Sequence, residues 1–445
     1  MLVAQTRKRV VIVGGGLGGM YAAAKLRKAP VDITIIDKAN HQLYQAMMYQ
    51  VAVGVLSPGQ VAPSLRSMLR HQPNARVVLG TVTRICPDER QLVLARPDGP
   101  EERFDYDILV FAPGVRTDYF GHDDYARCVA TLKTIDDAIW LRSRILSSLE
   151  IAELEDDPEQ LAKWTTFAIV GAGPTGVEMA GAIAQLTRTV VHRDFRKFDP
   201  SLTRIVLIDA APHVLGPFDP KLRDAALKAL RRGNVEVMLN TRVTNVCDGA
   251  VEVQGEDGEH MRIEAKTILW AAGMRSTAIG DQLAEATGAP TDRYGRIIVD
   301  DHCRVPGHPE IFVIGDAANQ GDLPMVAQPA MQEGKHVGKT ILHELGMHKD
   351  PGPFEYFNKG TMAQIGRGNA VADAFGVVKL SGFPGSVLWA ILHAWYVEGF
   401  FAKIEVTARW LWGLFSMNRR ERVITVKSAA LGQRPAPKTP DARKG

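Results

Sequence analysis

The sequence predicts an α/β protein with two Rossmann-like domains, followed by a C-terminal α+β region. Three observations predict this fold class. A pattern of strand, glycine turn, helix and strand occurs twice, several apolar runs end in glycine, and glycine-punctuated strands and Trp-rich helices follow Lys349. A chain of 445 residues is long enough for two or three hydrophobic cores.

The composition is that of a globular protein, with 46% hydrophobic and 23% charged residues. The 53 basic and 50 acidic residues nearly balance, which argues against nucleic-acid binding. None of the four cysteines has C-x-x-C spacing, so we predict no metal site and no local dithiol. No apolar run reaches about 18 residues, so no transmembrane helix is predicted. Only MLVAQTRK precedes the first strand, which does not resemble a signal peptide.

The first strand–turn–helix–strand pattern lies near the N-terminus. The run RVVIV leads into GGGLGGM, a helical pattern follows, and the strand DITIID ends on Asp37. Gly14, Gly16 and Gly19 have the spacing G-x-G-x-x-G, which lets the backbone and a helix N-terminus approach a pyrophosphate. A carboxylate at the end of the second strand accepts hydrogen bonds from ribose hydroxyls. The pattern therefore predicts a dinucleotide site.

The second pattern begins with FAIVGAGPTGVEMAGAIAQL and carries Gly171, Gly173 and Gly176 at the same spacing. Its second strand, RIVLIDAAP, contains Asp209. The intervening segment TRTVVHRDFRKFDPS is expected to be a helical extension or an insertion. Two such patterns in one chain imply two dinucleotides, a tightly held flavin and a passing nicotinamide cofactor.

Three further apolar runs end in glycine, as strands do when their carboxyl ends face a cofactor. YDILVFAPG ends on Gly114, TILWAAG ends on Gly273, and EIFVIGDAA contains Gly315 and Asp316. Because the Gly-Asp pair returns late in the chain, the N-terminal pattern is predicted to bind FAD and the second to bind the nicotinamide cofactor. No arginine follows Asp209, and its carboxylate would repel a 2′-phosphate, which favours NADH over NADPH.

From about Val10 to about Ile424 the chain resembles the type II NADH dehydrogenases, non-proton-pumping NADH:quinone oxidoreductases of the two-dinucleotide flavoprotein superfamily. The resemblance rests on HQLYQAMMYQVAVGVLSP, LKTIDDAIWLRSRIL, GPTGVEMAGAIAQL, VAQPAMQEG and NKGTMAQIGRGNAVAD. It implies a respiratory-chain flavoenzyme that passes hydride from NADH to FAD and then two electrons to a membrane quinone, ubiquinone or menaquinone.

The resemblance also implies roles for particular residues. Gln328 and Gln332 follow Ala327, share one helix face and would meet the quinone head group, for which neutral donors are suited. Glu178 would lie near the flavin and nicotinamide rings, and Lys359 near the flavin. From the residues alone, solvated amides, a helix-surface acid and a turn-exposed lysine remain alternatives. The segment with Tyr49 and Gln50 is expected to pass near the flavin.

The expected division of the chain has five parts. These are a first part of the FAD-binding domain (1–125), the NADH-binding domain (126–275), the second part of the FAD-binding domain with the quinone-site helix (276–348), a membrane-anchoring or dimerisation region (349–427) and a disordered tail (428–445).

A C-terminal helix is predicted to reach the membrane. At 100° per residue over 403–417, Glu405, Arg409, Gly413 and Ser416 form one narrow stripe. Most of the remaining surface is apolar and is formed by Ile404, Trp410, Leu411, Trp412, Leu414, Phe415 and Met417. Arginines at 419, 420 and 422 follow. This pattern is typical of a helix lying in the bilayer interface, here peripherally on the cytoplasmic face of the cell membrane. Burial in a homodimer interface is the alternative, and both can hold together.

Two other functions remain open at this stage. One is another reductase of the same fold, of the sulfide:quinone or ferredoxin type. Sulfide chemistry would require Cys128 and Cys303 to converge beside the flavin. The other is an NAD(H)-sensing flavoprotein whose output is partner binding.

Overall fold

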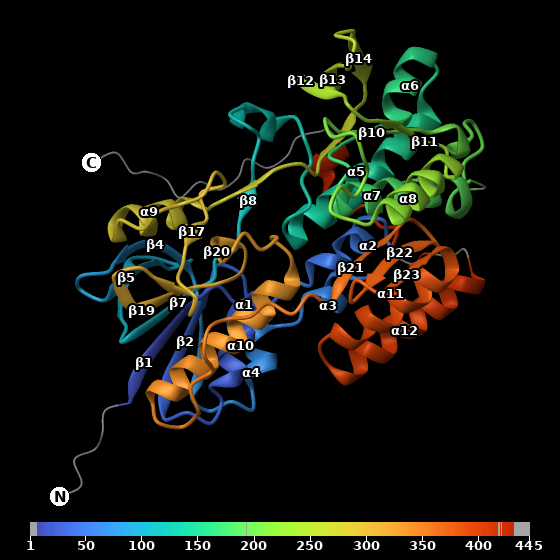
Figure 1. Cartoon of the computed structure of the whole chain (residues 1–445). Helices are drawn as coiled ribbons and strands as arrows, with labels where there is room; N and C mark the ends of the chain where they lie inside the picture. The colour runs from blue at the N-terminus through green and yellow to red at the C-terminus, as the bar shows by residue number, and fades with distance from the viewer. Residues whose placement is uncertain (1–6, 193, 417–418, 420, 431–445) are drawn as a thin grey trace, which may run out of the picture. The chain divides into compact units, whose positions relative to one another are not determined.

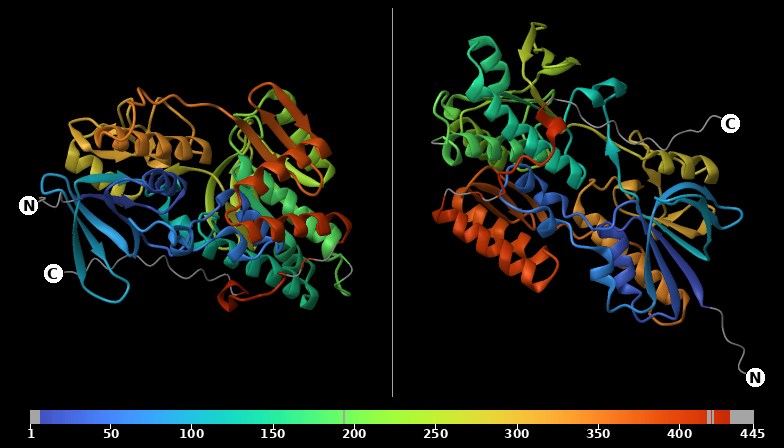
Figure 2. Two further views of the ribbon diagram at one scale, coloured as in Figure 1. Left: turned by 90° about the horizontal axis from the view of Figure 1, so that it is seen from below. Right: turned by 180° about the vertical axis from the view of Figure 1, so that it is seen from behind.

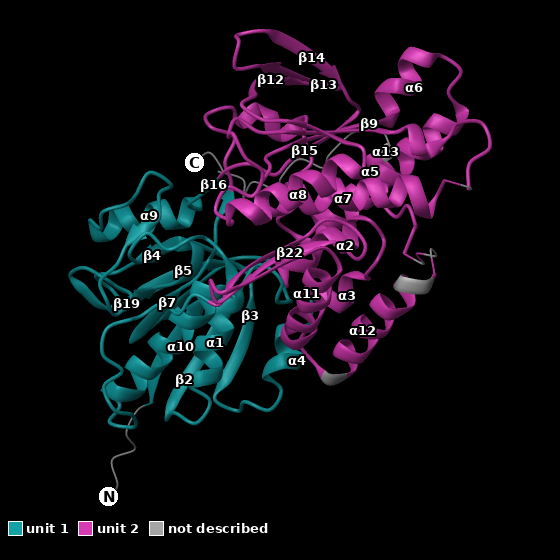
Figure 3. Ribbon diagram, turned by 45° about the vertical axis from the view of Figure 1, so that its right-hand side comes forward, with its two compact units in different colours: residues 1–43, 62–116, 274–358 teal, residues 44–61, 117–273, 359–445 magenta. Residues whose placement is uncertain are grey.

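The computed structural model describes residues 7–192, 194–416, 419 and 421–430. The chain divides into two compact units, shown in teal and magenta in Figure 3. The first unit contains residues 1–43, 62–116 and 274–358, and the second contains residues 44–61, 117–273 and 359–445. Each unit contains one of the two strand–glycine turn–helix–strand patterns, so both predicted Rossmann-like folds are present.

A six-stranded sheet in the order β18-β19-β7-β1-β2-β3 forms the centre of the first unit (Figure 1). All neighbouring strands run parallel except the antiparallel pair β18 and β19. The strands are β1 (Lys8–Val13), β2 (Val31–Asp37), β3 (Ala75–Leu79), β7 (Ile108–Phe111), β18 (Arg304–Val305) and β19 (His308–Val313). A parallel sheet is covered on both faces, which explains the continuous apolar runs of these strands.

Alternate residues of β1 enter opposite cores, since successive strand side chains point to opposite faces. Val10 and Ile12 pack in the core on the side of helices α1 and α10, whereas Val11 and Val13 pack in the core on the side of α9 and a small antiparallel sheet. The elements around the two cores are α1 (Leu17–Lys25), α4 (Leu65–Leu69), α9 (Ala278–Thr287), α10 (Ala327–Glu344), β4 (Thr81–Cys86), β5 (Gln91–Ala95), β6 (Glu101–Asp105), β17 (Ile297–Ile298) and β20 (Ala318–Asn319).

Helices α1 and α10 lie side by side on one face of this sheet (Figure 2). Their close approach depends on glycine. A Cβ added at Gly334 of α10 would lie 2.3 Å from the backbone oxygen of Gly18 in α1, and one at Gly338 would lie 2.6 Å from the Cβ of Lys25. The sequence QEGKHVGK therefore fixes how deeply the glutamine-bearing helix packs against the first glycine loop's helix.

A four-stranded parallel sheet in the order β11-β10-β9-β15 forms the centre of the second unit. Every residue of β9, the run TFAIV, is buried. The elements around it, from residue 44 to 273, are β9 (Thr166–Val170), β10 (Arg204–Ile208), β11 (Val235–Met238), β12 (Arg242–Cys247), β13 (Ala250–Gln254), β14 (His260–Glu264), β15 (Thr267–Trp270), α2 (Met48–Ala52), α3 (Pro58–Val61), α5 (Ile135–Leu154), α6 (Pro158–Thr165), α7 (Pro174–Gln185) and α8 (Pro220–Arg232). The short strands β8 (Arg116–Thr117) and β16 (Met274–Arg275) lie where the chain passes from one unit to the other.

The segment between α7 and β10 is an insertion with little regular structure. A π-helical turn, Leu186–Val190, continues α7, and a short 3₁₀ turn, Pro200–Leu202, precedes β10. Between them the backbone N–H groups of Arg196 and Lys197 donate to the Glu153 carboxylate at the end of α5, at 2.9 Å and 3.0 Å. The helical extension expected there is therefore only one turn long. The Glu153 side chain of α5 fixes the irregular segment that follows it through these two hydrogen bonds.

The C-terminal part of the second unit is an antiparallel three-stranded sheet followed by helices, as the glycine-punctuated pattern predicts. Its elements are β21 (Gly360–Gln364), β22 (Ala370–Ala374), β23 (Val378–Ser381), α11 (Gly382–Tyr396), α12 (Phe400–Phe415) and α13 (Lys427–Ala430). Among the residues that the structure describes, no helix combines the length and the apolarity needed to cross a bilayer.

The Trp-rich stretch is helical, as expected, and forms two helices, because the chain leaves the helical conformation at Val397 and takes a positive φ of +89° at Gly399. One expectation for this region needs correction. The tail predicted over 428–445 begins with the last residues of α13, and 431–445 lie outside the described residues. Helix α13 packs against α5, where Arg144 donates from Nη1 to the backbone oxygen of Ala429 at 2.9 Å.

Candidate functional site

The first glycine loop joins β1 to α1 in the first unit. Gly14 has a φ of +103°, and a Cβ added there would lie 2.1 Å from the backbone oxygen of Ala112. A Cβ at Gly19 would lie 2.1 Å from the backbone oxygen of Gly14. At Gly16, in contrast, nothing lies within 4 Å of an added Cβ. The first and third glycines thus permit a tight turn and close helix packing, and the middle one leaves room for a pyrophosphate at the helix N-terminus.

Asp37 ends β2 beside this loop. Its Oδ2 accepts a hydrogen bond from the backbone N–H of Gly15 at 2.6 Å, and its Oδ1 accepts one from Ala39 at 2.7 Å. A carboxylate offers about four lone-pair positions, so both oxygens retain capacity for ribose hydroxyls. The loop and the acid together fit the adenosine and pyrophosphate parts of a dinucleotide.

The second glycine loop, between β9 and α7, repeats this geometry in the second unit. Gly171 has a φ of +105°, and a Cβ at Gly176 would lie 1.8 Å from its backbone oxygen. Nothing lies within 4 Å of a Cβ at Gly173. Asp209 follows β10 and accepts backbone hydrogen bonds from Ala172 at 2.5 Å and from Ala211 at 2.8 Å. The second predicted dinucleotide site is therefore formed by the same contacts as the first.

The other predicted glycines lie directly after parallel strands, at the carboxyl edges of the two sheets. In the first unit Gly114 follows β7 with a φ of +71°, and Gly315 follows β19 with a φ of +69° and precedes Asp316. In the second unit Gly273 follows β15, and a Cβ there would lie 2.6 Å from the backbone oxygen of Asp118. These positions confirm that the glycine-ended runs are strands whose ends share the cofactor edge of each sheet.

Glu178 lies on α7 and is only 9% exposed. Burial raises the pKa of Glu178 to about 8, and the backbone N–H of Gln364, which donates to Oε1 at 3.3 Å, offsets part of that rise. The alternative of a helix-surface acid is therefore wrong. A carboxyl with this pKa holds its proton at neutral pH, as a group engaged in proton transfer requires.

Tyr49 and Gln50 on α2 are each 5% exposed. Gln50 Nε2 donates to the Tyr49 hydroxyl at 3.1 Å, and the indole Nε1 of Trp410 in α12 donates to Gln50 Oε1 at 2.8 Å. Burial, followed by the charge of Glu178, raises the pKa of Tyr49 well above its usual value. This chain of hydrogen bonds connects α2 to a C-terminal helix, which the sequence did not indicate.

The two predicted glutamines lie in the first turns of α10, which begins at Ala327, and both are half-buried. The Gln332 amide is held at both ends, since Nε2 donates to the backbone oxygen of Phe357 at 2.9 Å and Oε1 accepts from its N–H at 3.0 Å. Gln332 thereby fastens the segment that follows α10.

Lys359 precedes β21 and is half-buried, and its backbone oxygen accepts a hydrogen bond from the N–H of Phe375 at 3.2 Å. It belongs to the second unit together with Glu178, the second glycine loop, Asp209 and Gly273. The first unit holds the other predicted site residues, which are Gly14, Gly16, Gly19, Asp37, Gly114, Gly315, Asp316, Ala327, Gln328 and Gln332.

Sequence reasoning missed Glu333, which is 2% exposed on α10. Its Oε2 accepts a hydrogen bond from the backbone N–H of Gly315 at 2.5 Å. An acid directly after Gln332 on an otherwise apolar and glycine-rich face was the available signal, because an unpaired charge is seldom buried without a purpose.

Apolar side chains are exposed along both C-terminal helices. On α11 they recur at every fourth residue, and their exposed fractions are 58% at Phe383, 43% at Val387, 64% at Ile391 and 74% at Trp395. On α12 the exposed apolar residues are Phe401, Ile404, Leu411 and Trp412. A stripe of this kind marks an interaction surface.

The arginines after α12 do not form the exposed cluster that the sequence suggested. Arg419 donates from Nη1 to the backbone oxygen of Val53 at 2.9 Å, and burial lowers its pKa to about 10. Arg422 forms an ion pair with Asp194. Arg420 lies outside the described residues. On the predicted polar stripe, Arg409 is half-buried and pairs with Glu421 at 3.4 Å.

A cavity of about 1020 Å³ lies within the second unit, lined by residues of α2, α7, α11 and α12. Tyr49 and Gln50 line one side, and Trp389, which is 3% exposed, and Trp410 line another. Its walls continue into the exposed apolar side chains of α11, including Trp395. The size and the aromatic lining suit an apolar small molecule.

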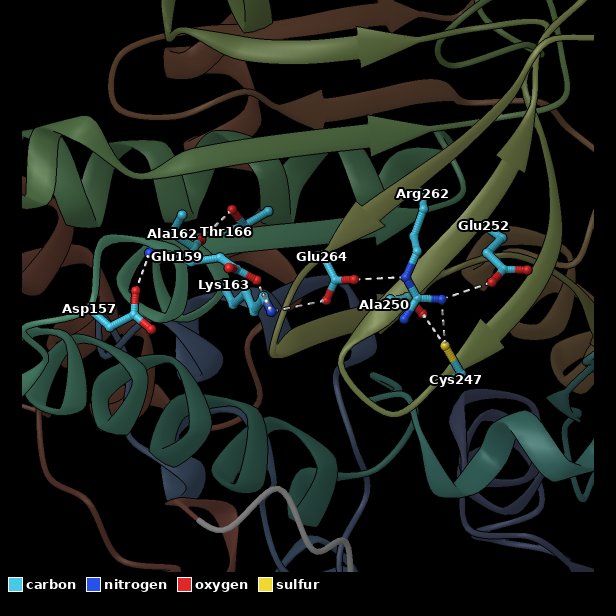
Figure 4. A network of polar contacts seen from close by, with 10 residues as sticks. All are labelled: Asp157, Glu159, Ala162, Lys163, Thr166, Cys247, Ala250, Glu252, Arg262 and Glu264. Atoms are coloured by element: carbon cyan, nitrogen blue, oxygen red, sulfur yellow. Dashed lines mark hydrogen bonds and ion pairs between the residues drawn. The ribbon is translucent and has the colours of Figure 1, made fainter.

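The four cysteines are all free thiols. Cys303 is fully buried in the core of the first unit, and burial raises the pKa of its thiol well above the usual value. Cys247 belongs to a surface network of the second unit, where Arg262 donates to its Sγ at 3.4 Å and pairs with Glu252 and Glu264 (Figure 4). Within the described ranges, no cluster of three or more His, Cys, Asp or Glu side chains could hold a metal ion.

Comparison with known proteins agrees with this geometry. The family model described as pyridine nucleotide-disulphide oxidoreductase matches residues 8–334. The type II NADH:quinone oxidoreductase Ndh of Mycobacterium tuberculosis is 43% identical over 425 residues, which are 95% of this chain and 91% of that protein. NdhA of the same organism is 41% identical over 426 residues, 95% of this chain and 90% of that protein.

Among solved structures, NDH2 from Plasmodium falciparum in complex with RYL-552 superposes with a TM-score of 0.86 at 19% identity, over 93% of this chain and 99% of that chain. The sulfide:quinone oxidoreductase from Aquifex aeolicus has a TM-score of 0.67 at 17% identity, over 95% of this chain and 93% of that chain. These likenesses establish the fold. On the family match and the identity to the mycobacterial enzymes, the chain belongs to the type II NADH:quinone oxidoreductases of the pyridine nucleotide-disulphide oxidoreductase family.

Proposed function

We propose that this protein oxidises NADH and reduces a membrane quinone through a bound FAD, without pumping protons. The observation that carries the proposal is the pair of glycine loops, each with an open middle glycine and an acid that accepts two backbone hydrogen bonds. When bound, FAD accepts hydride from NADH and delivers two electrons to the quinone.

The first unit is proposed to hold FAD. Gly14, Gly16 and Gly19 would receive its pyrophosphate, and Asp37 would accept hydrogen bonds from its adenosine ribose. Gly114, at the end of β7, and the turn of Gly315 and Asp316, at the end of β19, lie along the same edge of the sheet. The FAD-binding domain expected over 1–125 and 276–348 is proposed to correspond to the first unit, residues 1–43, 62–116 and 274–358.

The second unit is proposed to hold NADH, within residues 126–275. Gly171, Gly173 and Gly176 would receive its pyrophosphate, with Gly273 at the neighbouring strand end. Asp209 would accept hydrogen bonds from the adenosine ribose and repel a 2′-phosphate, because the residues after it, Ala-Ala-Pro, offer no cation.

Two further residues of the second unit are proposed to act on the cofactors. Glu178 would hold a proton beside the isoalloxazine and nicotinamide rings and would orient the nicotinamide. Its burial and its pKa of about 8 are consistent with a protonated side chain in this role. Lys359 would supply positive charge toward the flavin, where negative charge is to be stabilised.

The acceptor side is proposed to lie at the start of α10. Gln328 would donate to a quinone carbonyl beside Ala327, whether the quinone is ubiquinone or menaquinone. Gln332 would support the same face, and its two hydrogen bonds to Phe357 fix the segment against which the head group is placed. Neutral amides suit this task, because they need no counter-charge in an apolar slot.

Membrane attachment is proposed to be peripheral, on the cytoplasmic face, through the region 349–427. The support is the exposed apolar stripe of α11 and the exposed apolar residues of α12. A homodimer that shares part of this surface is compatible with the proposal.

The attachment can be tested with point variants. Ile391→Glu combined with Trp395→Glu places two charges on an exposed stripe without disturbing the core, since these residues are 64% and 74% exposed. We expect the variant to move from the membrane pellet to the supernatant while it keeps its flavin. Val377→Glu, at an 82% exposed site on the β22–β23 turn, is the matched control. A variant that still pellets fully would place the anchor elsewhere.

The activity itself is tested on the purified holoenzyme. The flavin is identified, and steady-state oxidation of NADH and NADPH by a short-chain quinone is compared. We expect fast turnover with NADH and much slower turnover with NADPH. Slow turnover with both would favour an NAD(H)-sensing role, and quinone reduction that depends on sulfide would revive the sulfide-type alternative.

A further inference from the structure

A buried carboxylate lies beneath the turn that ends β19 in the first unit. Glu333 Oε2 accepts the backbone N–H of Gly315 at 2.5 Å, and the Glu333 side chain is 2% exposed. Gly315 has a φ of +69°, and an added Cβ would lie 3.3 Å from the Cβ of Ala330. Ala330 and Glu333 are three residues apart and thus on one face of α10. The turn at Gly315 packs against this face.

This arrangement carries an energetic cost that an uncharged residue would avoid. A carboxylate removed from water is unfavourable unless hydrogen bonds compensate. The hydrogen bond satisfies the Gly315 N–H, which would otherwise be a buried donor, and a short bond to a charged acceptor is roughly twice as strong as a neutral one. The acid therefore holds this one peptide more firmly than packing alone would.

Few charged groups face Glu333 from the elements around it. Burial raises the pKa of Glu333 to about 7, and the hydrogen bond from the Gly315 N–H offsets part of that rise. The charge of Asp316 adds to the rise, and that of Arg296 opposes it. The thiol of Cys303, before β18, feels the Glu333 charge but is itself buried and neutral. Where α1 approaches the residue next to Glu333, it does so with uncharged backbone, since a Cβ added at Gly334 would lie 2.3 Å from the backbone oxygen of Gly18. The state of the Glu333 proton is therefore set mainly by burial.

We propose that Glu333 is a positioning residue of the flavin site, which fixes the Gly315–Asp316 turn against α10 for the bound FAD and loosens it when its negative charge is lost. The inference rests on the proposed placement of FAD in the first unit. Glu333 acts on the cofactor through the backbone of Gly315 and has no part in the transfer of electrons.

The direction of the pH effect follows from the hydrogen bond. Above pH about 7 the carboxylate is charged and accepts strongly from Gly315, and below this pH it is a neutral acid that accepts weakly. FAD should therefore leave faster as the pH falls from 8 to 6. A neutral acceptor in place of the carboxylate costs about five-fold in retention, and no acceptor costs roughly ten- to a hundred-fold.

The test measures FAD release from the full-length holoenzyme, by the rise in fluorescence of free flavin, between pH 6 and pH 8. Wild type should release FAD about five-fold faster at pH 6 than at pH 8. Glu333→Gln should release it at the fast rate throughout, with no pH dependence in this range. Glu333→Ala should release it faster still. Glu285→Gln, at an exposed position of α9 in the same unit, is the matched control and should follow wild type.

Two results would overturn the inference. One is a Glu333→Gln protein that keeps the pH profile of wild type, and the other is a Glu285→Gln protein that loses it. If Glu333→Ala does not fold, the pH profile of Glu333→Gln still decides. A wild-type protein that binds no FAD would instead overturn the proposed function, before any variant is compared.

Discussion

The two glycine loops are built alike, but their surroundings differ. In each, a Cβ at the third glycine would meet the backbone oxygen of the first, at 2.1 Å in the first unit and at 1.8 Å in the second. Behind the first loop, β19 returns late in the chain and adds the Gly315–Asp316 turn, which Glu333 holds. Behind the second, the described sheet ends at β15, and α7 instead carries the buried Glu178.

This difference indicates how one binding geometry serves two roles. A loop with an acid is sufficient to receive a dinucleotide, and both units have one. An additional turn held by a buried acid favours a cofactor that stays bound. A site without such a turn, with a protonatable group on the helix after its glycine loop, suits a cofactor that arrives, reacts and leaves. If the two units have these different roles, variants in one unit should affect one cofactor and spare the other.

Substitution of the third glycine in either loop should abolish or strongly weaken the binding of one cofactor and leave the other cofactor bound. Gly19→Ala places a Cβ against the backbone of Gly14, and Gly176→Ala places one against Gly171, so neither loop can keep its shape. We expect Gly19→Ala to lose the flavin absorbance. Gly176→Ala should keep the flavin but bind NADH at least about 100-fold more weakly, measured by titration.

Gly99→Ala, where nothing lies within 4 Å of the added Cβ, is the matched control for both variants. If Gly19→Ala retained FAD while Gly176→Ala lost it, the assignment of the two cofactors to the two units would have to be exchanged.

Glu178→Gln should stabilise the protein at high pH. The pKa of Glu178 is about 8 in the folded state, above its ordinary value of 4.5. A raised carboxyl pKa means that the folded state holds the proton more tightly, so the cost of ionisation is absent below pH 4.5, grows between 4.5 and 8, and is full above 8. The gain for Glu178→Gln is on the order of 4 kcal/mol at pH 9 and near zero at pH 4.5.

Denaturant midpoints at the two pH values measure this gain, with Glu150→Gln, an exposed acid of α5, as the control. A gain of equal size at both pH values would contradict the buried ionisation of Glu178. The result also tests whether the second unit trades stability for a protonatable group at Glu178.

The glutamines of α10 should affect only the oxidative half-reaction. Gln328→Ala removes a neutral donor from the proposed acceptor face, and the loss of about 1–3 kcal/mol slows flavin reoxidation by quinone roughly ten- to a hundred-fold. Bleaching of the flavin by NADH under anaerobic conditions should be nearly unchanged, as followed by rapid-mixing absorbance.

Gln332→Ala should have a second effect, because it also removes both hydrogen bonds between the Gln332 amide and the backbone of Phe357. Its effect on reoxidation should therefore include a loss of order in the segment after α10, measurable as faster amide hydrogen exchange around Phe357 that Gln328→Ala does not show. Equal slowing of both half-reactions by either variant would mean that the glutamines support the flavin pocket in general.

Asp209→Ala should have the smallest effect. Loss of the carboxylate removes hydrogen bonds to the ribose and the repulsion of a 2′-phosphate, so the preference for NADH over NADPH in kcat/KM should narrow by about ten-fold. The matched variant in the other unit is Asp37→Ala, which should weaken FAD retention and leave the NADH preference unchanged. Comparable kcat/KM for the two reductants in wild type would remove the role assigned to Asp209.

The sequence by itself determined the parts of this protein that depend on local geometry. The spacing of Gly14, Gly16 and Gly19 predicts a tight turn, an open middle position and a close helix, and all three are present. At Gly14 and Gly19 an added Cβ would lie 2.1 Å from a backbone oxygen, whereas at Gly16 nothing lies within 4 Å of it. The two parallel sheets followed from continuous apolar runs, since strands covered on both faces need apolar side chains throughout.

Tertiary structure alone decided which polar groups are buried and what they contact. Glu178 meets Gln364 across 186 residues of sequence, and the Gln332 amide is held by Phe357, 25 residues away. Glu333 lies beneath a strand end 18 residues before it, and Arg419 is held by Val53 instead of facing a membrane. A pKa or a free hydrogen-bonding position depends on burial and on partners distant in sequence, which local pattern does not encode.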